Sequence, residues 1–129
     1  MEKYLIDSCI FLEILLKQEK CELCKKYLEK RIGNIFISDF SLHSTGIILF
    51  NLNKAKDYNI FLEDVLPKVE LVPLPVTEYF KIIKIQLKYN LDFDDSYQTA
   101  VANSFGLTIS TLDKDFRKIQ NAHRIEFVK

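Results

Sequence analysis

Short apolar runs alternate with helix-periodic stretches along the chain, and this alternation constrains the fold more than any other feature. The stretches between the runs repeat apolar residues every three or four positions, as amphipathic helices do. Strands separated by helices form parallel sheets through right-handed crossovers, with helices on both faces. We therefore expect an α/β fold, a three-layer sandwich with a mostly parallel central sheet of about five strands. The expected strands cover residues 4–6, 35–38, 69–72, 107–110 and 125–128.

Helical periodicity and helix-ending residues give the segments between the strands. One helix follows Ser8, and another is expected to begin with Asp39 or Ser41 as its cap. Gly33, Pro67 and Gly106 stand where helices are expected to end. The remaining helices are expected over residues 21–31, 57–66, 77–89, 94–105 and 114–120.

The helix over residues 77–89 carries a specific prediction about which face is buried. Phe80, Ile83 and Leu87 recur at helical spacing, and the lysines at 81, 84 and 88 recur beside them. We expect the three apolar residues to face the core and the lysines to face solvent.

Size and composition indicate one globular domain over residues 1–129. Of the 129 residues, 48% are hydrophobic and 28% charged, which suits a core of ordinary density. The 18 basic and 18 acidic side chains cancel, so the net charge does not indicate a general nucleic-acid coat protein. Any binding of RNA or DNA has to come from local patches.

The sequence also predicts the cellular compartment of the protein. Its amino terminus lacks the features of a signal peptide, and no apolar stretch approaches the roughly 20 residues that cross a bilayer. Three cysteines do not make a disulfide framework, and the pair Cys21 and Cys24 lacks the second pair that a structural zinc site needs. We expect a cytoplasmic protein without membrane contact, in which these two cysteines are ordinary helix residues.

Acidic residues stand where expected strands end. Asp7 follows the first strand, Asp113 follows the fourth, and Asp94 and Asp95 open the helix before the fourth. The carboxyl ends of parallel strands face a common crevice, so Asp7 and Asp113 are expected to meet there. Asp95 joins them if the loop before its helix returns to that edge. Converging carboxylates repel one another unless a cation lies between them, which predicts a Mg²⁺ or Mn²⁺ site.

Such a site suits phosphodiester hydrolysis. Mg²⁺ prefers oxygen ligands and keeps several waters, so three or four aspartates are sufficient. The metal lowers the pKa of a water and offsets charge that develops on the phosphate. Aspartate also caps helices, and for Asp94, Asp95 or Asp115 taken alone a cap is the better interpretation. Acids after two separate strands favour the metal site.

These motifs, in this order and over the whole chain, resemble the PIN domain of VapC-like toxins and other metal-dependent ribonucleases. The segment YLIDSCIFLEILL resembles the family's opening strand, acid, hydroxyl residue and helix. LDFDDSYQTAVANSFGLTIST resembles its third motif, and TLDKDF its threonine-x-aspartate motif, which matches Thr111. The resemblance implies a divalent-metal-dependent endoribonuclease. It assigns the catalytic metal ligands to Asp7, Asp95 and Asp113, and we expect Ser8, Ser44, Asp94 and Asp115 in the supporting shell.

One position departs from the family's pattern. The second acid of the family is a glutamate in the first turns of the helix after strand two, in a pattern like S-L-x-E, and Ser44 stands there. A serine cannot replace the charge, so metal affinity should fall unless a neighbour compensates. The alternative is therefore a catalytically degenerate PIN-like domain that acts as an RNA-binding or protein-interaction module. The neighbours considered are Asp39, His43, Asp94 and Asp115.

The resemblance also implies partners. The substrate is RNA, and VapC-like toxins commonly form dimers and are held inactive by an antitoxin. A homodimer and an antitoxin partner are accordingly hypotheses for this chain, with the apolar face of residues 41–53, or Phe61, Leu62 and Leu66, as the interface. The side chains that would grip RNA are Lys17, Lys20, Lys114, Arg117 and Lys118.

Two other α/β classes with clustered aspartates fit less well. Receiver domains place paired acids after strand one and a phosphoacceptor after strand three, whereas strand three here leads to Pro73. Haloacid-type phosphatases need a D-x-D on the first strand, and Asp7 is followed by Ser8 and Cys9.

Overall fold

A five-stranded sheet runs through the centre of the computed structural model, which describes residues 1–129. Its strand order is β3-β2-β1-β4-β5, and every neighbouring pair is parallel. This confirms the expected α/β sandwich with a parallel sheet. The strands are β1 (Tyr4–Ile6), β2 (Ile35–Ser38), β3 (Glu70–Val72), β4 (Thr108–Thr111) and β5 (Ile125–Phe127).

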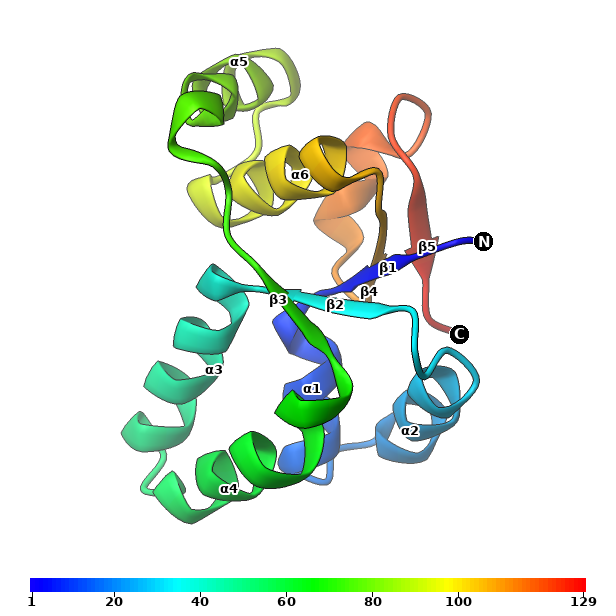
Figure 1. The fold of residues 1–129 in the computed structure, drawn as a ribbon, viewed down its shortest axis with the longest axis vertical. Coiled ribbons are helices and arrows are strands. Elements are labelled where there is room, and N and C mark those ends of the chain that lie inside the picture. Colours follow the sequence, from blue (N-terminus) through cyan, green and yellow to red (C-terminus); the bar gives the residue numbers. More distant parts are fainter.

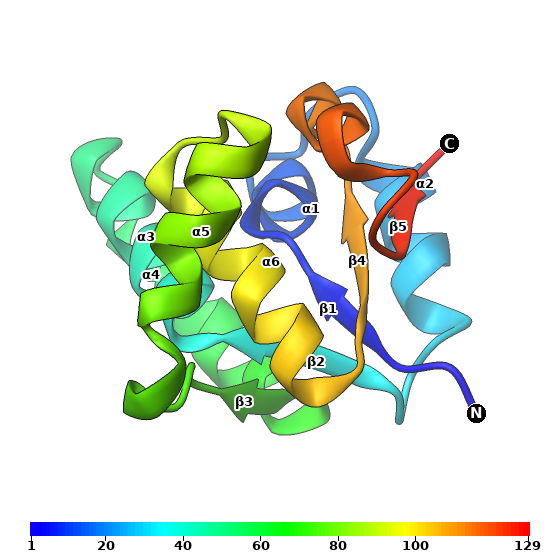
Figure 2. The same ribbon diagram turned by 90° about the horizontal axis from the view of Figure 1, so that it is seen from above.

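Helices cover both faces of the sheet. Helices α5 and α6 lie on one side, and α1 to α4 lie on the other (Figure 1). The view from above shows α5 beside α6 (Figure 2). The helices are α1 (Ser8–Leu15), α2 (Cys21–Glu29), α3 (Asp39–Asn51), α4 (Ala55–Ile60), α5 (Phe80–Tyr89) and α6 (Phe93–Phe105). A π-helical turn (Phe61–Val65) and 3-10 turns at Leu66–Lys68, Val76–Glu78 and Lys114–Ile119 complete the chain.

Each face of the sheet packs its own hydrophobic core, because successive side chains of a strand point to opposite faces. Leu5 and Ile109 belong to the cluster that includes residues of α5 and α6. Ile6 and Ile37 belong to the cluster on the other face, with Phe11 of α1. The buried strands fix β1 and β4 side by side, which brings the segments after them together.

The helix caps differ from those expected. Ser38, at the end of β2, caps α3 by accepting a hydrogen bond from the Ser41 N–H at 3.0 Å, so neither Asp39 nor Ser41 is the cap. Asp92 caps α6 by accepting from the Asp95 N–H at 3.0 Å. The side chain of Asp113 caps the Lys114–Ile119 turn. The carboxylates of Asp94, Asp95 and Asp115 therefore do not cap these helices.

The prediction for the buried face of α5 was wrong. Phe80, Ile83 and Leu87 are 54%, 64% and 74% exposed, whereas Ile82 and Ile85 are buried in the core beside α6. The helix carries two apolar stripes, and helical periodicity does not say which one faces the sheet. Packing against α6 decides in favour of Ile82 and Ile85.

The segment predicted as one helix over residues 57–66 is divided. Helix α4 ends at Ile60, a π-helical turn follows, and a 3-10 turn contains Pro67. Phe61 is fully buried and packs edge-on against Phe11 with ring centroids 5.1 Å apart. Phe61 is thus part of the core and not of an exposed interface, contrary to the expectation.

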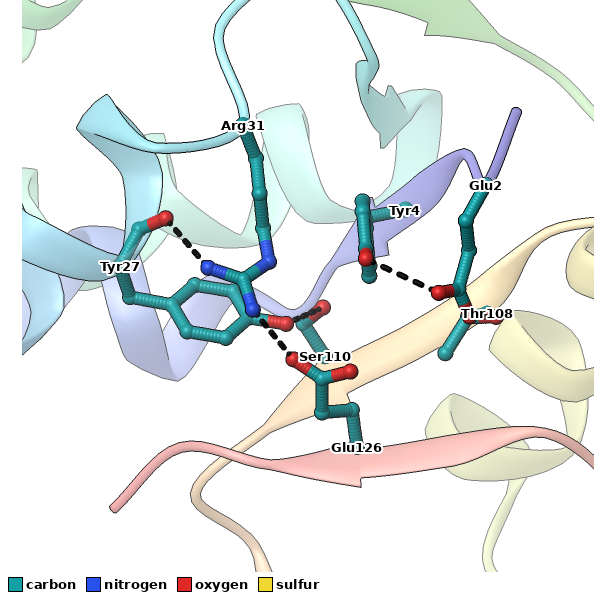
Figure 3. Close-up of polar contacts among 7 residues, drawn as sticks. All are labelled: Glu2, Tyr4, Tyr27, Arg31, Thr108, Ser110 and Glu126. Carbon is teal, nitrogen blue, oxygen red and sulfur yellow. Dashed lines mark hydrogen bonds and ion pairs between the residues drawn. The ribbon is translucent and has the colours of Figure 1, made fainter.

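A polar cluster ties the end of α2 to the sheet (Figure 3). Arg31 donates hydrogen bonds to the Tyr27 carbonyl at 2.9 Å and to Glu126 of β5 at 2.7 Å, and its guanidinium lies 3.5 Å from the Tyr27 ring centroid. The hydroxyls of Tyr27 and Ser110 share a hydrogen bond of 2.5 Å across the buried face. This cluster holds β4 and β5 against α2.

Cys21 and Cys24 lie in α2, as expected for ordinary helix residues. Cys21 and Cys24 are free, and Cys24 is buried in the core. None of the helices combines the length and apolar character that crossing a membrane requires.

Candidate metal centre

Three carboxylates gather beyond the carboxyl end of β4. One oxygen each from Asp95, Asp113 and Asp115 lies within 4.8 Å of the other two. Asp95 belongs to the first turn of α6, so the loop before that helix does return to this edge of the sheet. Three carboxylate oxygens at this spacing are a donor set that suits a hard divalent cation such as Mg²⁺ or Mn²⁺.

Asp7 is joined to this group through Thr111. The Thr111 hydroxyl donates to Asp7 Oδ2 at 2.7 Å and accepts from the Asp113 N–H at 2.9 Å. The Asp7 N–H donates to the Ser110 carbonyl at 2.9 Å, which fixes the loop after β1 against β4. Parallel pairing of β1 with β4 therefore brings Asp7 and Asp113 to one place, as the strand pattern predicted.

Cys9 also holds Asp7, and sequence reasoning missed it. Its sulfur lies 3.5 Å from Asp7 Oδ2 and accepts a hydrogen bond from the Leu112 N–H at 3.4 Å. Oδ2 of Asp7 is thus bound by two donors. The sequence spacing could have indicated this contact. Cys9 stands two residues after Asp7 in the first turn of a helix, from where a side chain can reach back to the neighbouring strand.

Burial and repulsion between neighbouring carboxylates raise the pKa values of the acids at this site. The pKa of Asp95 is raised to about 8 by burial first, and then by Asp92, Asp113, Asp7 and Asp115. Burial likewise raises the pKa of Asp7, with a further contribution from Asp113, although hydrogen bonds from Thr111 and Cys9 oppose the rise. A bound divalent cation removes this repulsion and favours the ionised carboxylates.

Burial, and then the charge of Asp7, raises the pKa of the Cys9 thiol well above its usual range. The thiol therefore stays protonated and acts as a hydrogen-bond donor to Asp7. In this role it differs from reactive cysteines, which need a depressed pKa.

Asp92 is a second residue that sequence reasoning left out of the site. It is the cap of α6, and after burial it makes the largest contribution to the raised pKa of Asp95. The signal is the three-residue spacing from Asp92 to Asp95, which is the spacing between a cap and the N–H it accepts from.

The supporting residues named from the sequence lie at different places. Ser8 begins α1, and its backbone N–H lowers the pKa of Asp7 by hydrogen bonding. Ser44 is half-buried one turn beyond Ser41 on α3. Asp94 is exposed and is not one of the three grouped acids, whereas Asp115 is.

Among the neighbours considered as substitutes for the missing glutamate, Asp115 alone belongs to the group of three. Asp39 instead accepts a hydrogen bond from the Tyr97 hydroxyl at 2.6 Å, and His43 is exposed. The extra charge near the centre therefore comes from the Lys114–Ile119 turn and not from α3.

The expected RNA-gripping cations are all exposed. Lys114, Arg117 and Lys118 belong to the same short turn as Asp115. Lys118 donates a hydrogen bond to the Asn90 carbonyl at 3.0 Å, which holds the loop before α6.

A family model described as the PIN domain matches residues 4–122, which include every one of these acids. The chain belongs to the PIN domain family. The match agrees with the resemblance of the sequence motifs and extends over most of the chain. No curated protein matches the chain.

Solved structures with the same fold include VapBC complexes and a VapC toxin. VapBC2 from Rickettsia felis, bound to a promoter DNA fragment, has 17% identity and a TM-score of 0.82 over 98% of both chains. DNA-bound VapBC from Salmonella typhimurium has 17% identity and a TM-score of 0.78 over 100% of both chains. The sarcin-ricin loop cleaving toxin VapC20 from Mycobacterium tuberculosis has 10% identity and a TM-score of 0.76, over 94% of this chain and 96% of that one. At these identities the similarity is one of fold.

Proposed function

We propose that this PIN domain is a divalent-metal-dependent endoribonuclease of the VapC-like toxin type, which hydrolyses RNA phosphodiesters. The observation that carries the proposal is the group of Asp95, Asp113 and Asp115 beside Asp7, at the edge where parallel strands end. Asp7, Asp95 and Asp113 would hold Mg²⁺ or Mn²⁺. When bound, the ion would supply an activated water and offset charge on the phosphate.

The residues around these ligands would orient them and surround them with polar groups. Thr111 and Cys9 orient the Asp7 carboxylate by binding its Oδ2, and so would hold it in place as a ligand. With its pKa raised to about 8, Asp95 would hold a proton at neutral pH in the absence of metal, and a cation held there would favour its ionised form. Ser8, Ser44, Asp94 and Asp115 would form the surrounding polar shell, and Asp115 is the one that groups with Asp95 and Asp113.

RNA is the proposed substrate, held by a few phosphate contacts. Lys114 and Arg117 are exposed in the turn that contains Asp115, and they would supply these contacts. The balanced net charge is consistent with local contacts in place of a broad basic surface. Binding through such contacts weakens steeply as salt concentration rises.

An antitoxin protein and a second copy of this chain are the proposed protein partners. A toxin–antitoxin complex from Klebsiella pneumoniae, with 14% identity, shares the fold with a TM-score of 0.76. On this chain, Ile47 and Phe50 of α3 are 59% and 60% exposed, and they line a groove of about 440 Å³ beside Tyr58. Apolar surface of this kind is typical of protein interfaces. It supports the interface expected on the α3 face.

A cleavage assay on mixed RNAs with Mg²⁺ or Mn²⁺ tests the nuclease, run beside the Asp95→Asn variant and an EDTA control. The wild type should cut only with metal, and Asp95→Asn should lose activity while its thermal unfolding stays cooperative. Full activity of purified Asp95→Asn would remove Asp95 from the mechanism.

The second candidate function is a PIN domain that binds RNA or protein without cutting. Ser44 at the position of the family's glutamate favours it. The same assay separates the two, because a binding module retains RNA in a filter or polarisation measurement and yields no metal-dependent product.

A further inference from the structure

A cavity lies at the same edge of the sheet as the acidic group. It is a cavity of about 320 Å³ lined by Asp39, Phe40, His43, Tyr79, Phe93 and Tyr97. Cavities of about 300 to 1,000 Å³ are typical of small-molecule sites. Asp39 follows β2, and Tyr79 follows β3 by way of a short turn, so the cavity stands beyond the carboxyl ends of these strands. The acidic group stands beyond β1 and β4, roughly 10 Å along the edge at two strand spacings.

The floor of the cavity is a fixed aromatic ring. Tyr97 is 3% exposed, and its hydroxyl donates to Asp39 Oδ1 at 2.6 Å and accepts from the Leu74 N–H at 3.0 Å. The ring centroids of Phe40, Tyr79 and Phe93 lie 5.9, 5.9 and 6.0 Å from that of Tyr97. A floor held by packing and by two hydrogen bonds is preorganised, which lowers the cost of binding a ligand.

The rim of the cavity exposes aromatic surface at the helix end that also carries Asp95. Phe93 is 53% exposed and Tyr79 is 43% exposed. Phe93 opens α6 two residues before Asp95, so one helix end presents a stacking surface and a carboxylate of the acidic group. Exposed aromatic rings are the surface on which unpaired bases of single-stranded nucleic acid stack.

The polar groups of the cavity suit a base more than a phosphate. Its lining contains no lysine or arginine. Asp39 Oδ1 accepts from the Tyr97 hydroxyl and from the Phe40 N–H, whereas Oδ2 makes no hydrogen bond within the chain. Asp39 Oδ2 and the exposed His43 imidazole can bond to the donor and acceptor edge of a base.

We propose that this cavity binds one nucleobase of a single-stranded RNA whose phosphodiester lies at the acidic group. The inference rests on the proposed ribonuclease function and adds a determinant of sequence preference to it. The base stacks on Phe93 and Tyr79, over the floor made by Tyr97. Asp39 and His43 then favour bases whose edges match their hydrogen bonds.

A tryptophan reporter tests the site, because the chain contains no tryptophan. Phe93→Trp places the reporter in the cavity, and Phe80→Trp is the matched control, since Phe80 is 54% exposed on α5 and does not line the cavity. Both are made in an Asp113→Asn background, so that the RNA is not cut, and are titrated with 12-nucleotide oligo(A), oligo(C), oligo(G) and oligo(U) in Mg²⁺. RNA should quench Phe93→Trp strongly and leave Phe80→Trp unchanged.

A second measurement asks whether the ring contributes to affinity. Phe93→Leu keeps the apolar volume and removes the stacking face, so it should weaken RNA binding roughly 5-fold to 150-fold. Phe80→Leu should leave binding unchanged. In an otherwise wild-type enzyme, Phe93→Leu should raise KM for RNA while kcat changes little. Replacing the contacted nucleotide by an abasic one should abolish the difference between Phe93→Leu and wild type.

Three outcomes contradict the inference in different ways. Cleavage by the wild type together with an unresponsive Phe93→Trp overturns the base site and leaves the nuclease intact. Absence of metal-dependent cleavage by the wild type removes the nuclease and the base site together. An emission of Phe93→Trp that changes on dilution without RNA assigns the cavity to contact between two copies of the chain, and overturns the base site as well.

Discussion

Thr111 and Asp7 are 104 residues apart in the sequence, yet the hydroxyl of one donates to the carboxylate of the other at 2.7 Å. The same hydroxyl accepts the N–H of Asp113 at 2.9 Å. One buried side chain thus sets the relative position of two acids that belong to different strand ends. The proposed metal centre depends on this contact as much as on the acids themselves.

Thr111→Val should weaken Mn²⁺ binding and RNA cleavage about 10-fold to 100-fold, which is the usual effect of removing a residue that orients a metal ligand. Valine fills the space of the side chain but cannot donate to Asp7. Thr111→Ser keeps the hydroxyl and should retain most of the affinity. Calorimetric titration with Mn²⁺ measures the effect, and equal affinities for the valine and serine variants would contradict it.

Cys9 should resist alkylation in the folded protein. Cys9 is half-buried, and the pKa of its thiol is raised by burial and by Asp7, so little thiolate is present near neutral pH. Iodoacetamide labelling followed by peptide mass spectrometry should show slow modification of Cys9 in buffer and rapid modification in urea. Rapid labelling of the folded protein would mean that the thiol does not hold Asp7 as described.

The metal-free protein should lose stability as pH rises from about 4 to about 8. The pKa of Asp95 is near 4 when unfolded and about 8 when folded, so the native state binds more protons throughout this window. Stability therefore falls with rising pH, and the raised pKa of Asp7 acts in the same direction. Asp95→Asn should flatten the dependence and raise the Tm at pH 8.

Thermal unfolding in EDTA between pH 5 and pH 9 measures this effect. Adding Mg²⁺ should raise the Tm of the wild type more at pH 8 than at pH 6, because protons compete with the ion for the carboxylates. Identical pH profiles for wild type and Asp95→Asn would show that Asp95 is not the group that titrates.

Ser44→Glu should strengthen metal binding and increase cleavage, because it restores a carboxylate where the family pattern has one. Ser44→Gln, of nearly the same size without the charge, is the matched control and should give no gain. Mn²⁺ affinity and cleavage rate measured side by side test this. A glutamate variant that binds metal no better than the glutamine variant would mean that residue 44 does not face the ion.

Arg31→Lys should lower the free energy of unfolding by about 1 to 3 kcal/mol, since lysine cannot reproduce both the hydrogen bonds to Tyr27 and Glu126 and the stacking on the Tyr27 ring. The exposed neighbour Lys30 provides the control, and Lys30→Ala should change stability by less than about 0.5 kcal/mol. Urea unfolding monitored by circular dichroism gives both values. Equal stabilities for the two variants would show that the cluster in Figure 3 contributes little.

The elements of the fold follow from local patterns. Apolar runs such as residues 35–38 and helix stops such as Gly106, which adopts a left-handed conformation, are read directly from neighbouring residues. The same patterns place Asp7 and Asp113 after strands, and parallel pairing of β1 with β4 then makes them neighbours. The family could be recognised because these local signals occur in a fixed order.

What the sequence alone determined is therefore the order of strands and helices, and the acids at the strand ends, because both depend on residues close together in the chain. Tertiary structure decided that Ile82 and not Ile83 is buried, that Cys9 binds Asp7, and that Asp115 joins Asp95 and Asp113. Each of these depends on which surfaces meet across the sheet. Side-chain contacts over long separations are set by packing in three dimensions, which helical and strand periodicity do not encode.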